Sequence, residues 1–204
     1  MGLPSLLFNA LTFPGLLANE VVQGLFEQHF GAPTRRFAVP DDLDEEELEA
    51  NPGRIQEIRE LDDAENPEPH EQVQYAVDYE GVEQYSHLFW LVLGPFFVTS
   101  VLALLLFGVS VGAEAARFAS RQENVALWLV LFYPGFAVAA HAFPNSEPTN
   151  ALYDRSETMS SPLRLVGYPI VAVSKAVNAL RFLWVDALYA IGLYLLVAIP
   201  VGAI

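Results

Sequence analysis

The sequence predicts an all-α integral membrane protein with about five membrane-spanning segments, a short β element, and an acidic, partly disordered loop between the first two segments. Three observations predict this class. The chain of 204 residues is 53% hydrophobic and has a positive mean hydropathy. Several of its apolar runs approach or exceed the roughly 20 residues that a helix needs to cross a bilayer. The acidic residues, in contrast, are concentrated in one stretch near the first apolar run.

That acidic stretch is residues 41–83. It contains 17 acidic side chains and only two basic ones, Arg54 and Arg59, so it alone carries the whole net charge of −15. A stretch with such a charge and with Pro and Gly breaks buries little apolar surface, and a solvated, partly disordered loop is expected. The sequence has no basic patch that could meet phosphates, which argues against nucleic-acid binding.

Two further features of the composition bear on the class of protein. The chain has no cysteine, which excludes disulfides and thiolate metal sites. High acid content combined with a single lysine, Lys175, and no cysteine suggests a halophilic, archaeal source. The expected location is the cell membrane, which a multi-pass chain would cross several times.

The first half of the chain divides into a membrane segment and a loop. Residues 1–26 form the first predicted membrane segment, in which Pro14-Gly15 would kink or begin a helix. Residues 27–86 form the acidic extramembrane loop. Within that loop, residues 30–39 and 73–82 alternate between apolar and polar side chains, and each predicts a short strand.

Residues 87–204 are expected to supply the remaining membrane bundle. Residues 87–111 predict the second span and residues 124–143 the third, and the polar, turn-rich residues 144–162 predict a loop. The last apolar block, residues 163–204, would be about 63 Å long as one helix. That is roughly twice the thickness of a bilayer core, so two spans that turn near residues 178–181 are predicted.

Polar side chains interrupt the first apolar run at one place. Asn19 and Gln23 are four residues apart and share one face of a helix, with Glu20 beside them. A carboxylate at membrane depth is costly, so Glu20 is a candidate functional residue. The alternative is that the helix ends early and Glu20 lies in water at the interface.

This polar segment resembles the zinc-binding helix of the site-2 intramembrane metalloproteases, and most closely that of the small archaeal membrane metalloproteases related to them. In that family His-Glu-x-x-His binds zinc through both histidines, and the glutamate activates the zinc-bound water. The corresponding residues here are Asn19-Glu20-Val21-Val22-Gln23. The flanking Pro14-Gly15 and Phe30-Gly31 also resemble the family pattern.

Two later stretches extend the resemblance. Gly94-Pro95 with Thr99 resembles a Gly-Pro-x-x-Asn element of the next core helix, where the family usually has asparagine in place of Thr99. Asn178 and Asp186 match the spacing of a family asparagine and of the aspartate that is the third zinc ligand. The alternating residues 73–82 resemble an edge strand that, in relatives, pairs with an unfolding substrate.

The departures from the family pattern decide the functional hypothesis. Asn19 and Gln23 offer neutral amide oxygens, which are poor zinc ligands beside imidazole, so no cofactor is expected. The resemblance then implies a pseudoprotease that binds a partner protein or a substrate helix within the lipid bilayer. Glu20 and Asp186 would persist in a polar core with those two amides. Other members of that core are predicted to be Asn178, Thr99 and His141.

Two alternatives remain open. The first is an active zinc metalloprotease with substitute ligands, in which Glu20, Asp186 and either His29 or His141 would hold the metal. For His141, a role as a capping or interface side chain is the competing interpretation. The second alternative is a small transporter built on the two buried carboxylates, although the chain has no inverted repeat and few charges within its apolar runs.

Overall fold

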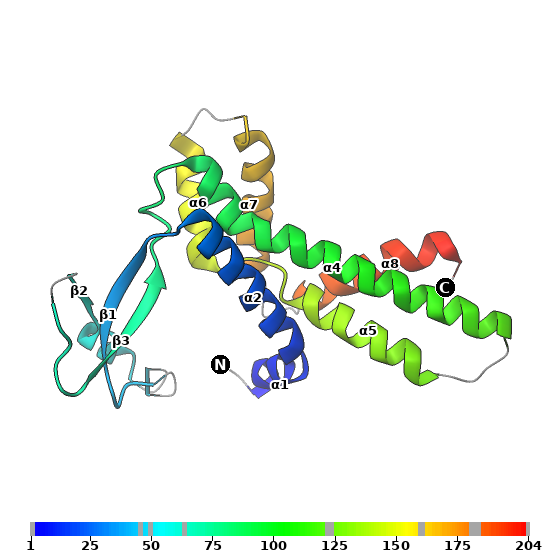
Figure 1. Ribbon diagram of the computed structural model, residues 1–204, viewed down its shortest axis with the longest axis horizontal. Coiled ribbons are helices and arrows are strands. Elements are labelled where there is room, and N and C mark those ends of the chain that lie inside the picture. Colours follow the sequence, from blue (N-terminus) through cyan, green and yellow to red (C-terminus); the bar gives the residue numbers. More distant parts are fainter. Residues whose placement is uncertain are drawn as a thin grey trace.

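The structure is a computed structural model that describes residues 3–44, 47–48, 51–62, 65–120, 125–158, 162–179 and 185–202. A small sheet stands at one end of a helical body, and the long helix α4 runs through that body (Figure 1). In chain order the elements are α1 (Leu3–Leu11), α2 (Phe13–Phe30), β1 (Thr34–Pro40), the 3₁₀ helix η1 (Pro52–Glu57), β2 (Arg59–Leu61), β3 (Glu71–Val77), α4 (Tyr85–Ser120), α5 (Val125–Ala140), α6 (Ser146–Thr158), α7 (Arg164–Ala179) and α8 (Val185–Val201).

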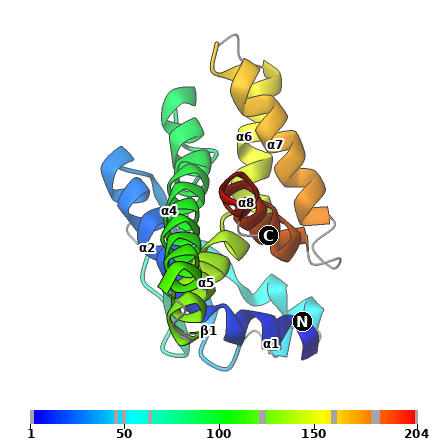
Figure 2. The same ribbon diagram turned by 90° about the vertical axis from the view of Figure 1, so that its right-hand side faces the viewer.

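Helices α2, α5 and α8 pack around α4. Helix α2 contacts α4 and α5, and α8 contacts the same two helices. Figure 2 shows α4 between α2 and α8. One core cluster, which includes Phe107, Val138 and Ala190, joins α4, α5 and α8. Glu20 and Asp186 therefore lie on two different helices, α2 and α8, which both contact α4 and α5.

Helices α6 and α7 cover the first turns of α4. The Tyr85 hydroxyl and the Ser156 hydroxyl lie 2.8 Å apart, which ties α6 to the start of α4. Gly167 of α7 lies so close that a Cβ there would be 2.9 Å from the Tyr85 hydroxyl and 3.1 Å from the Phe89 ring. Leu88, Leu152 and Val171 are buried in the core that these three helices share.

Two glycines allow α2 to approach its neighbours closely. A Cβ on Gly15 would lie 1.9 Å from the carbonyl oxygen of Ala137, so the backbones of α2 and α5 touch at this point. A Cβ on Gly94 would lie 2.0 Å from the Phe26 ring, which therefore rests directly on the backbone of α4. Small residues at such crossings are what lets two helices pack backbone against backbone.

The sheet has the strand order β2-β1-β3, and both pairings are antiparallel. The Asp78 amide donates to the Pro33 carbonyl at 2.8 Å, and the Asp41 amide donates to the His70 carbonyl at 2.9 Å. In an antiparallel ladder, hydrogen-bonded pairs alternate with pairs that are not bonded to each other. In β3, the backbone groups of Val73, Tyr75 and Val77 therefore point away from β1, towards the outer edge of the sheet.

The described part of the acidic loop is folded, and residues 45–46, 49–50 and 63–64 of this stretch lie outside the described residues. Strands β1 and β3 overlap the two stretches that alternate, and β2 and η1 form between them. Each of the two arginines in this stretch binds several carboxylates. Arg54 pairs with Asp42, Glu47 and Glu57, and Arg59 pairs with two further glutamates. These ion pairs offset the repulsion that the composition alone suggests.

The prediction of about five membrane spans is wrong. Among the described residues, one helix is long and apolar enough to cross a membrane, namely Tyr85–Ala113 of α4. The predicted first span breaks at Thr12 into α1 and α2. Helices α5 and α8 are apolar, but their apolar parts, Leu129–Ala140 and Val185–Val201, are too short to meet the same criterion.

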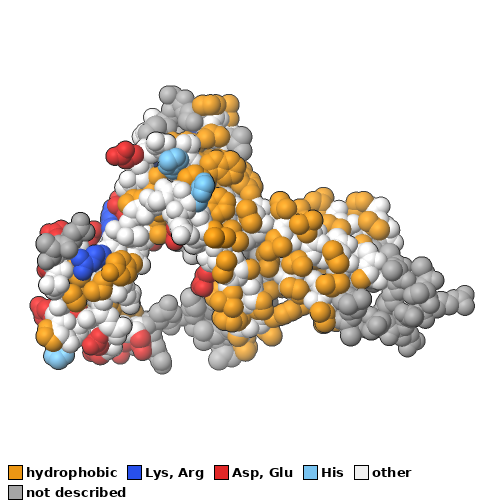
Figure 3. Space-filling model, viewed as in Figure 1, with side chains coloured by type: hydrophobic (Ala, Val, Ile, Leu, Met, Phe, Trp, Pro, Cys, Tyr) orange, Lys and Arg blue, Asp and Glu red, His pale blue; other side chains and the backbone are white. Residues whose placement is uncertain are grey.

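Residues 144–162, predicted to be a polar loop, are largely helical instead. Helix α6 occupies Ser146–Thr158 and buries Thr149, Leu152 and Ser156 on one face. These residues are three and four positions apart, so they line up along a helix. Charged and polar side chains still gather on the sheet, whereas apolar side chains cover the visible surface of the α4 region (Figure 3).

Candidate functional site

A cavity of about 240 Å³ opens beside α2, at the segment that resembles the metal-binding motif. Its walls come from α2, from the loop after β3, from the Gly-Pro region of α4, and from the segment that enters α6. The lining residues are Asn19, Glu20, Gln23, Glu27, Tyr79, Val92, Pro95, Phe96, Ala142, Pro144, Asn145, Glu147 and Pro148. The structure thus brings together the three polar residues of the predicted motif and the proline of the predicted Gly-Pro element.

The side chain of Gln23 is fixed by two partners. Its amide nitrogen donates to the Glu27 carboxylate at 3.0 Å and to the Tyr79 hydroxyl at 2.8 Å. Tyr79 is only 9% exposed. Burial, followed by the negative charges of Glu27 and Glu147, raises the pKa of Tyr79 well above its ordinary value, although the hydrogen bond from Gln23 opposes this. The phenol therefore stays neutral and supplies a hydroxyl to the cavity.

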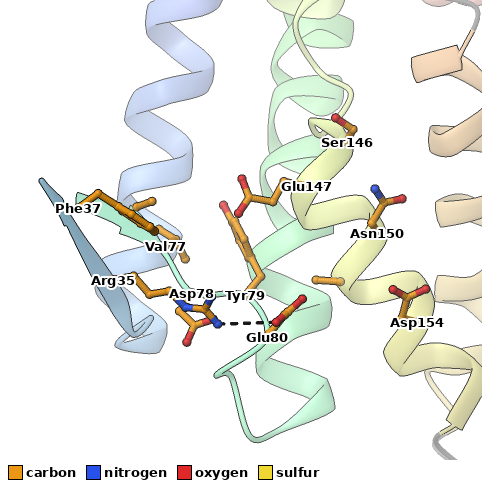
Figure 4. A pocket seen from close by; sticks show the side chains of 12 residues that line it. Arg35, Phe37, Val77, Asp78, Tyr79, Glu80, Ser146, Glu147, Asn150 and Asp154 are labelled. Carbon is orange, nitrogen blue, oxygen red and sulfur yellow. Dashed lines mark hydrogen bonds and ion pairs between the residues drawn. The ribbon is translucent and has the colours of Figure 1, made fainter. Parts of the chain in front are cut away.

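A second cavity, of about 430 Å³, lies between the sheet and α6. Figure 4 shows Arg35, Phe37 and Val77 on the sheet side, Ser146, Asn150 and Asp154 on the α6 side, and Tyr79 between them. Tyr79 and Glu147 line both cavities. The two cavities therefore adjoin at these two side chains, one beside the end of β3 and the other beside the polar face of α2.

Acidic side chains dominate the walls of this second cavity. Asp78, Glu80, Glu147 and Asp154 line it, and Arg35 is the basic residue among the lining side chains. The Arg35 guanidinium already lies 2.7 Å from Asp78 and 3.6 Å from Glu80. The cavity consequently has an excess of negative charge.

The ion pair at the mouth of this cavity also shifts a pKa. Partial burial disfavours the ionised form of Asp78, but the hydrogen bonds from the Arg35 side chain and the Gly81 amide outweigh that effect. The pKa of Asp78 is therefore held below its ordinary value. This ion pair and the buried ring of Tyr79 together hold the loop between β3 and α4 in place.

Asp186, which the resemblance predicted as the counterpart of the third zinc ligand, does not line either of these two cavities. It is buried in the first turn of α8. Asn178, its partner in the predicted motif, lies near the end of α7, and its side chain is outside the described part of the structure. Asp186 therefore lies on α8, whereas Asn19 and Gln23 lie on α2 and line the smaller cavity.

Thr99 and His141 also lie outside the two cavities. The Thr99 hydroxyl is buried and donates to the Pro95 carbonyl at 2.7 Å within α4. His141 follows α5, and its Nε2 atom lies 2.7 Å from the Thr12 hydroxyl. Because that hydroxyl donates to the Phe8 carbonyl, it accepts from the imidazole, so His141 ties α5 to the break between α1 and α2. His29 is exposed near the end of α2, with its ring against Phe30.

These residues do not fit a tetrahedral zinc site. The two motif positions are amides, and Gln23 is held by Glu27 and Tyr79. Among the described residues, no group of three His, Cys, Asp or Glu side chains could hold a metal ion. The arrangement offers hydrogen-bond donors, acceptors and negative charge to a ligand.

Sequence reasoning missed three residues of the site: Glu27, Tyr79 and Glu147. Glu27 could have been found, because it is four residues after Gln23 and follows the same helix face. Tyr79 and Glu147 join the site only through the packing of the sheet and α6 against α2, which the sequence does not encode locally. A comparison of the chain with protein-family models, curated proteins and solved structures finds no match.

Proposed function

We propose that this chain is a membrane-associated protein, similar to the site-2 metalloproteases, that binds an extended segment of a partner protein and does not hydrolyse it. The observation that carries the proposal is the pair of adjoining cavities that runs from the edge strand β3 to Glu20 and shares Tyr79 and Glu147. In a protease of that family the same route would bring a substrate to the metal. Here it ends on Asn19, Glu20 and Gln23.

The outer edge of β3 supports binding of an extended segment. The strand is at the edge of the sheet, and Val73, Tyr75 and Val77 direct their backbone donors and acceptors outward. An exposed edge of this kind is a template for another strand, and main-chain hydrogen bonds give such pairing its affinity. A segment paired with β3 would continue past Val77 into the cavity beside α6.

The charge of the cavity supports a basic partner. Its lining has four carboxylates against one guanidinium, and Arg35 is already paired with Asp78. A lysine or arginine side chain in the bound segment would reduce this excess of negative charge. Since such pairs are near the surface, their contribution should weaken as salt screens them.

Two features support the absence of hydrolysis. Asn19 and Gln23 are poor zinc ligands, and Asp186 is not among the residues that line their cavity. Without a metal, nothing lowers the pKa of a water molecule near Glu20 towards neutrality. The apolar part of α4, residues 85–113, supports membrane association through one span.

Strand pairing can be tested with a photo-crosslinking amino acid at Ala76, which lines the larger cavity, and with the same amino acid at Ile55 as a control. In native membranes, crosslinks to a partner are expected from position 76 and not from position 55. Tyr75→Pro removes an outward-facing donor without breaking the ladder to β1, so it should abolish the crosslinks, while Tyr75→Ala should retain them. Equal crosslinking by both Tyr75 variants would refute strand pairing.

The loss of chemistry can be tested by restoring histidines. Asn19→His together with Gln23→His places two imidazoles on one face of α2, and zinc binding should appear in elemental analysis of the purified protein. In that background, Glu147→Gln should reduce the zinc content and Asp186→Asn should not, because only Glu147 shares the cavity. Stoichiometric zinc in the native protein, with hydrolysis of a membrane substrate that Glu20→Ala abolishes, would overturn the proposal.

A further inference from the structure

One face of α7 is exposed and apolar. The opposite face is buried against α4 and α6, through residues such as Gly167, Val171 and Ser174. On the exposed face Leu165 is 81% exposed and Val173 is 56% exposed. The exposed apolar positions repeat at helical spacing and form one stripe, which consists of Leu165, Pro169, Ala172, Val173 and Ala176.

The basic residues of α7 lie along one border of this stripe. The helix carries Arg164 and Lys175 and no acidic residue, although the whole chain has a net charge of −15. At about 100° per residue, these two positions are only about 20° apart around the helix axis, and about 100° from the middle of the stripe. The Lys175 ammonium lies 4.1 Å from the centre of the Tyr153 ring, and the Arg164 guanidinium lies 6.0 Å from that of Tyr168. Basic and aromatic side chains thus adjoin an apolar stripe.

The position of α7 matches one end of the candidate span. Gly167 lies against Tyr85 and Phe89, in the first turns of α4, and the apolar part of α4 begins at Tyr85. Figure 1 shows α7 crossing α4 near this end and not running alongside it. Trp90, which is 42% exposed, is on the same part of α4. Tryptophan and tyrosine are enriched where a membrane meets water.

We propose that α7 is an interfacial helix that rests on an anionic lipid surface, with its apolar stripe in the outer acyl region and Arg164 and Lys175 at the headgroups. An amphipathic helix with an apolar face and basic side chains binds a bilayer in this way. Anionic headgroups complement the two basic side chains, whereas a second copy packed on the same stripe would bring the basic side chains of two α7 helices together, in two chains that each carry a net charge of −15. The inference goes beyond partner binding, but it rests on the proposed membrane association through α4.

The absence of cysteine allows a direct test, because a single introduced cysteine takes a nitroxide label at one known position. The full chain would be reconstituted in vesicles of phosphatidylcholine with phosphatidylglycerol. A label at Val173→Cys reports on α7, and a label at Val109→Cys reports on α4. A label at Ile55→Cys, in η1 beside the sheet, is the aqueous control. All three native side chains are exposed. The collision rates of the nitroxide with oxygen and with a water-soluble nickel chelate distinguish a label in lipid from a label in water.

The expected result is that Val173→Cys and Val109→Cys are several-fold less accessible to the nickel chelate than Ile55→Cys. A basic side chain near an anionic surface contributes about a fivefold preference, so Arg164→Gln should raise nickel accessibility at position 173. The same change should have no effect in vesicles of phosphatidylcholine alone, and Arg54→Gln should have none in either.

Three outcomes would overturn the inference. Water-like accessibility at position 173, with lipid-like accessibility at position 109, refutes the interfacial helix and leaves the span of α4 intact. Water-like accessibility at both positions refutes the membrane association as well. Spin–spin broadening at position 173 would mean that a second copy covers the stripe.

Discussion

The crossing of α2 and α5 makes a sharp prediction about Gly15. In Gly15→Ala the new Cβ would lie 1.9 Å from the Ala137 carbonyl oxygen and 2.7 Å from the Val138 amide nitrogen. Comfortable contact requires about 3.5 Å, so the two helices would have to separate by roughly 1.5 Å. Overpacking typically costs about 1–3 kcal/mol, and the upper end applies because both atoms belong to the backbone and cannot rotate away.

Gly24→Ala, in the same helix, is the matched control. Nothing lies within 4 Å of a Cβ at that position, so the change should only gain helix propensity, about 0.5–1 kcal/mol. For a chain of this size each kcal/mol moves the melting temperature by about 2–4 °C. Gly15→Ala should therefore lower it by about 6–12 °C, and Gly24→Ala should raise it by about 1–4 °C, when helical circular dichroism is followed in detergent. A Gly15→Ala protein as stable as the native one would refute the backbone contact.

Two further predictions concern the loop between β3 and α4. Tyr79→Phe removes the acceptor of the Gln23 amide and should cost about 1 kcal/mol in the same melting assay, whereas Tyr75→Phe, at an exposed position, should change nothing. The pKa of Asp78 is lower in the folded chain than in the unfolded one, so its contribution to stability is present above about pH 4 and is lost as the pH falls through the folded value. The acid side of the stability curve between about pH 5 and 2 should be flatter in Arg35→Gln, and an unchanged curve would contradict this role of the ion pair.

Local patterns predicted several elements of the fold. The apolar residues 87–111 are long enough to predict α4 unaided, and the length of residues 163–204 predicts a division where α7 ends at Ala179. Alternation predicts strands at β1 and β3. Strand β2 has only three residues and no alternation of its own, because it depends on pairing with β1. Helix α6 contains Pro148 and Asn150, which resemble turn signals, and its burial of Leu152 depends on α4.

The number of spans and the composition of the site needed tertiary information. Apolar composition cannot distinguish a helix that crosses a membrane from one that is short and packed against α4, as α5 is. The i and i+4 spacing predicts that Asn19 and Gln23 face one cavity, as they do. The eight-residue spacing of Asn178 and Asp186 carries no information about how α8 packs, and Asp186 does not line the cavity beside α2.

The two cavities share two of their lining side chains. Because Tyr79 and Glu147 line both, and Tyr79 holds the Gln23 amide, any group that moves these side chains on one side changes the walls on the other. Thermodynamic linkage makes such an influence reciprocal. A segment bound beside β3 would alter the affinity of the α2 cavity for a small ligand by some factor, and that ligand would alter the affinity for the segment by the same factor. Occupancy of one cavity would in this way become a signal at the other.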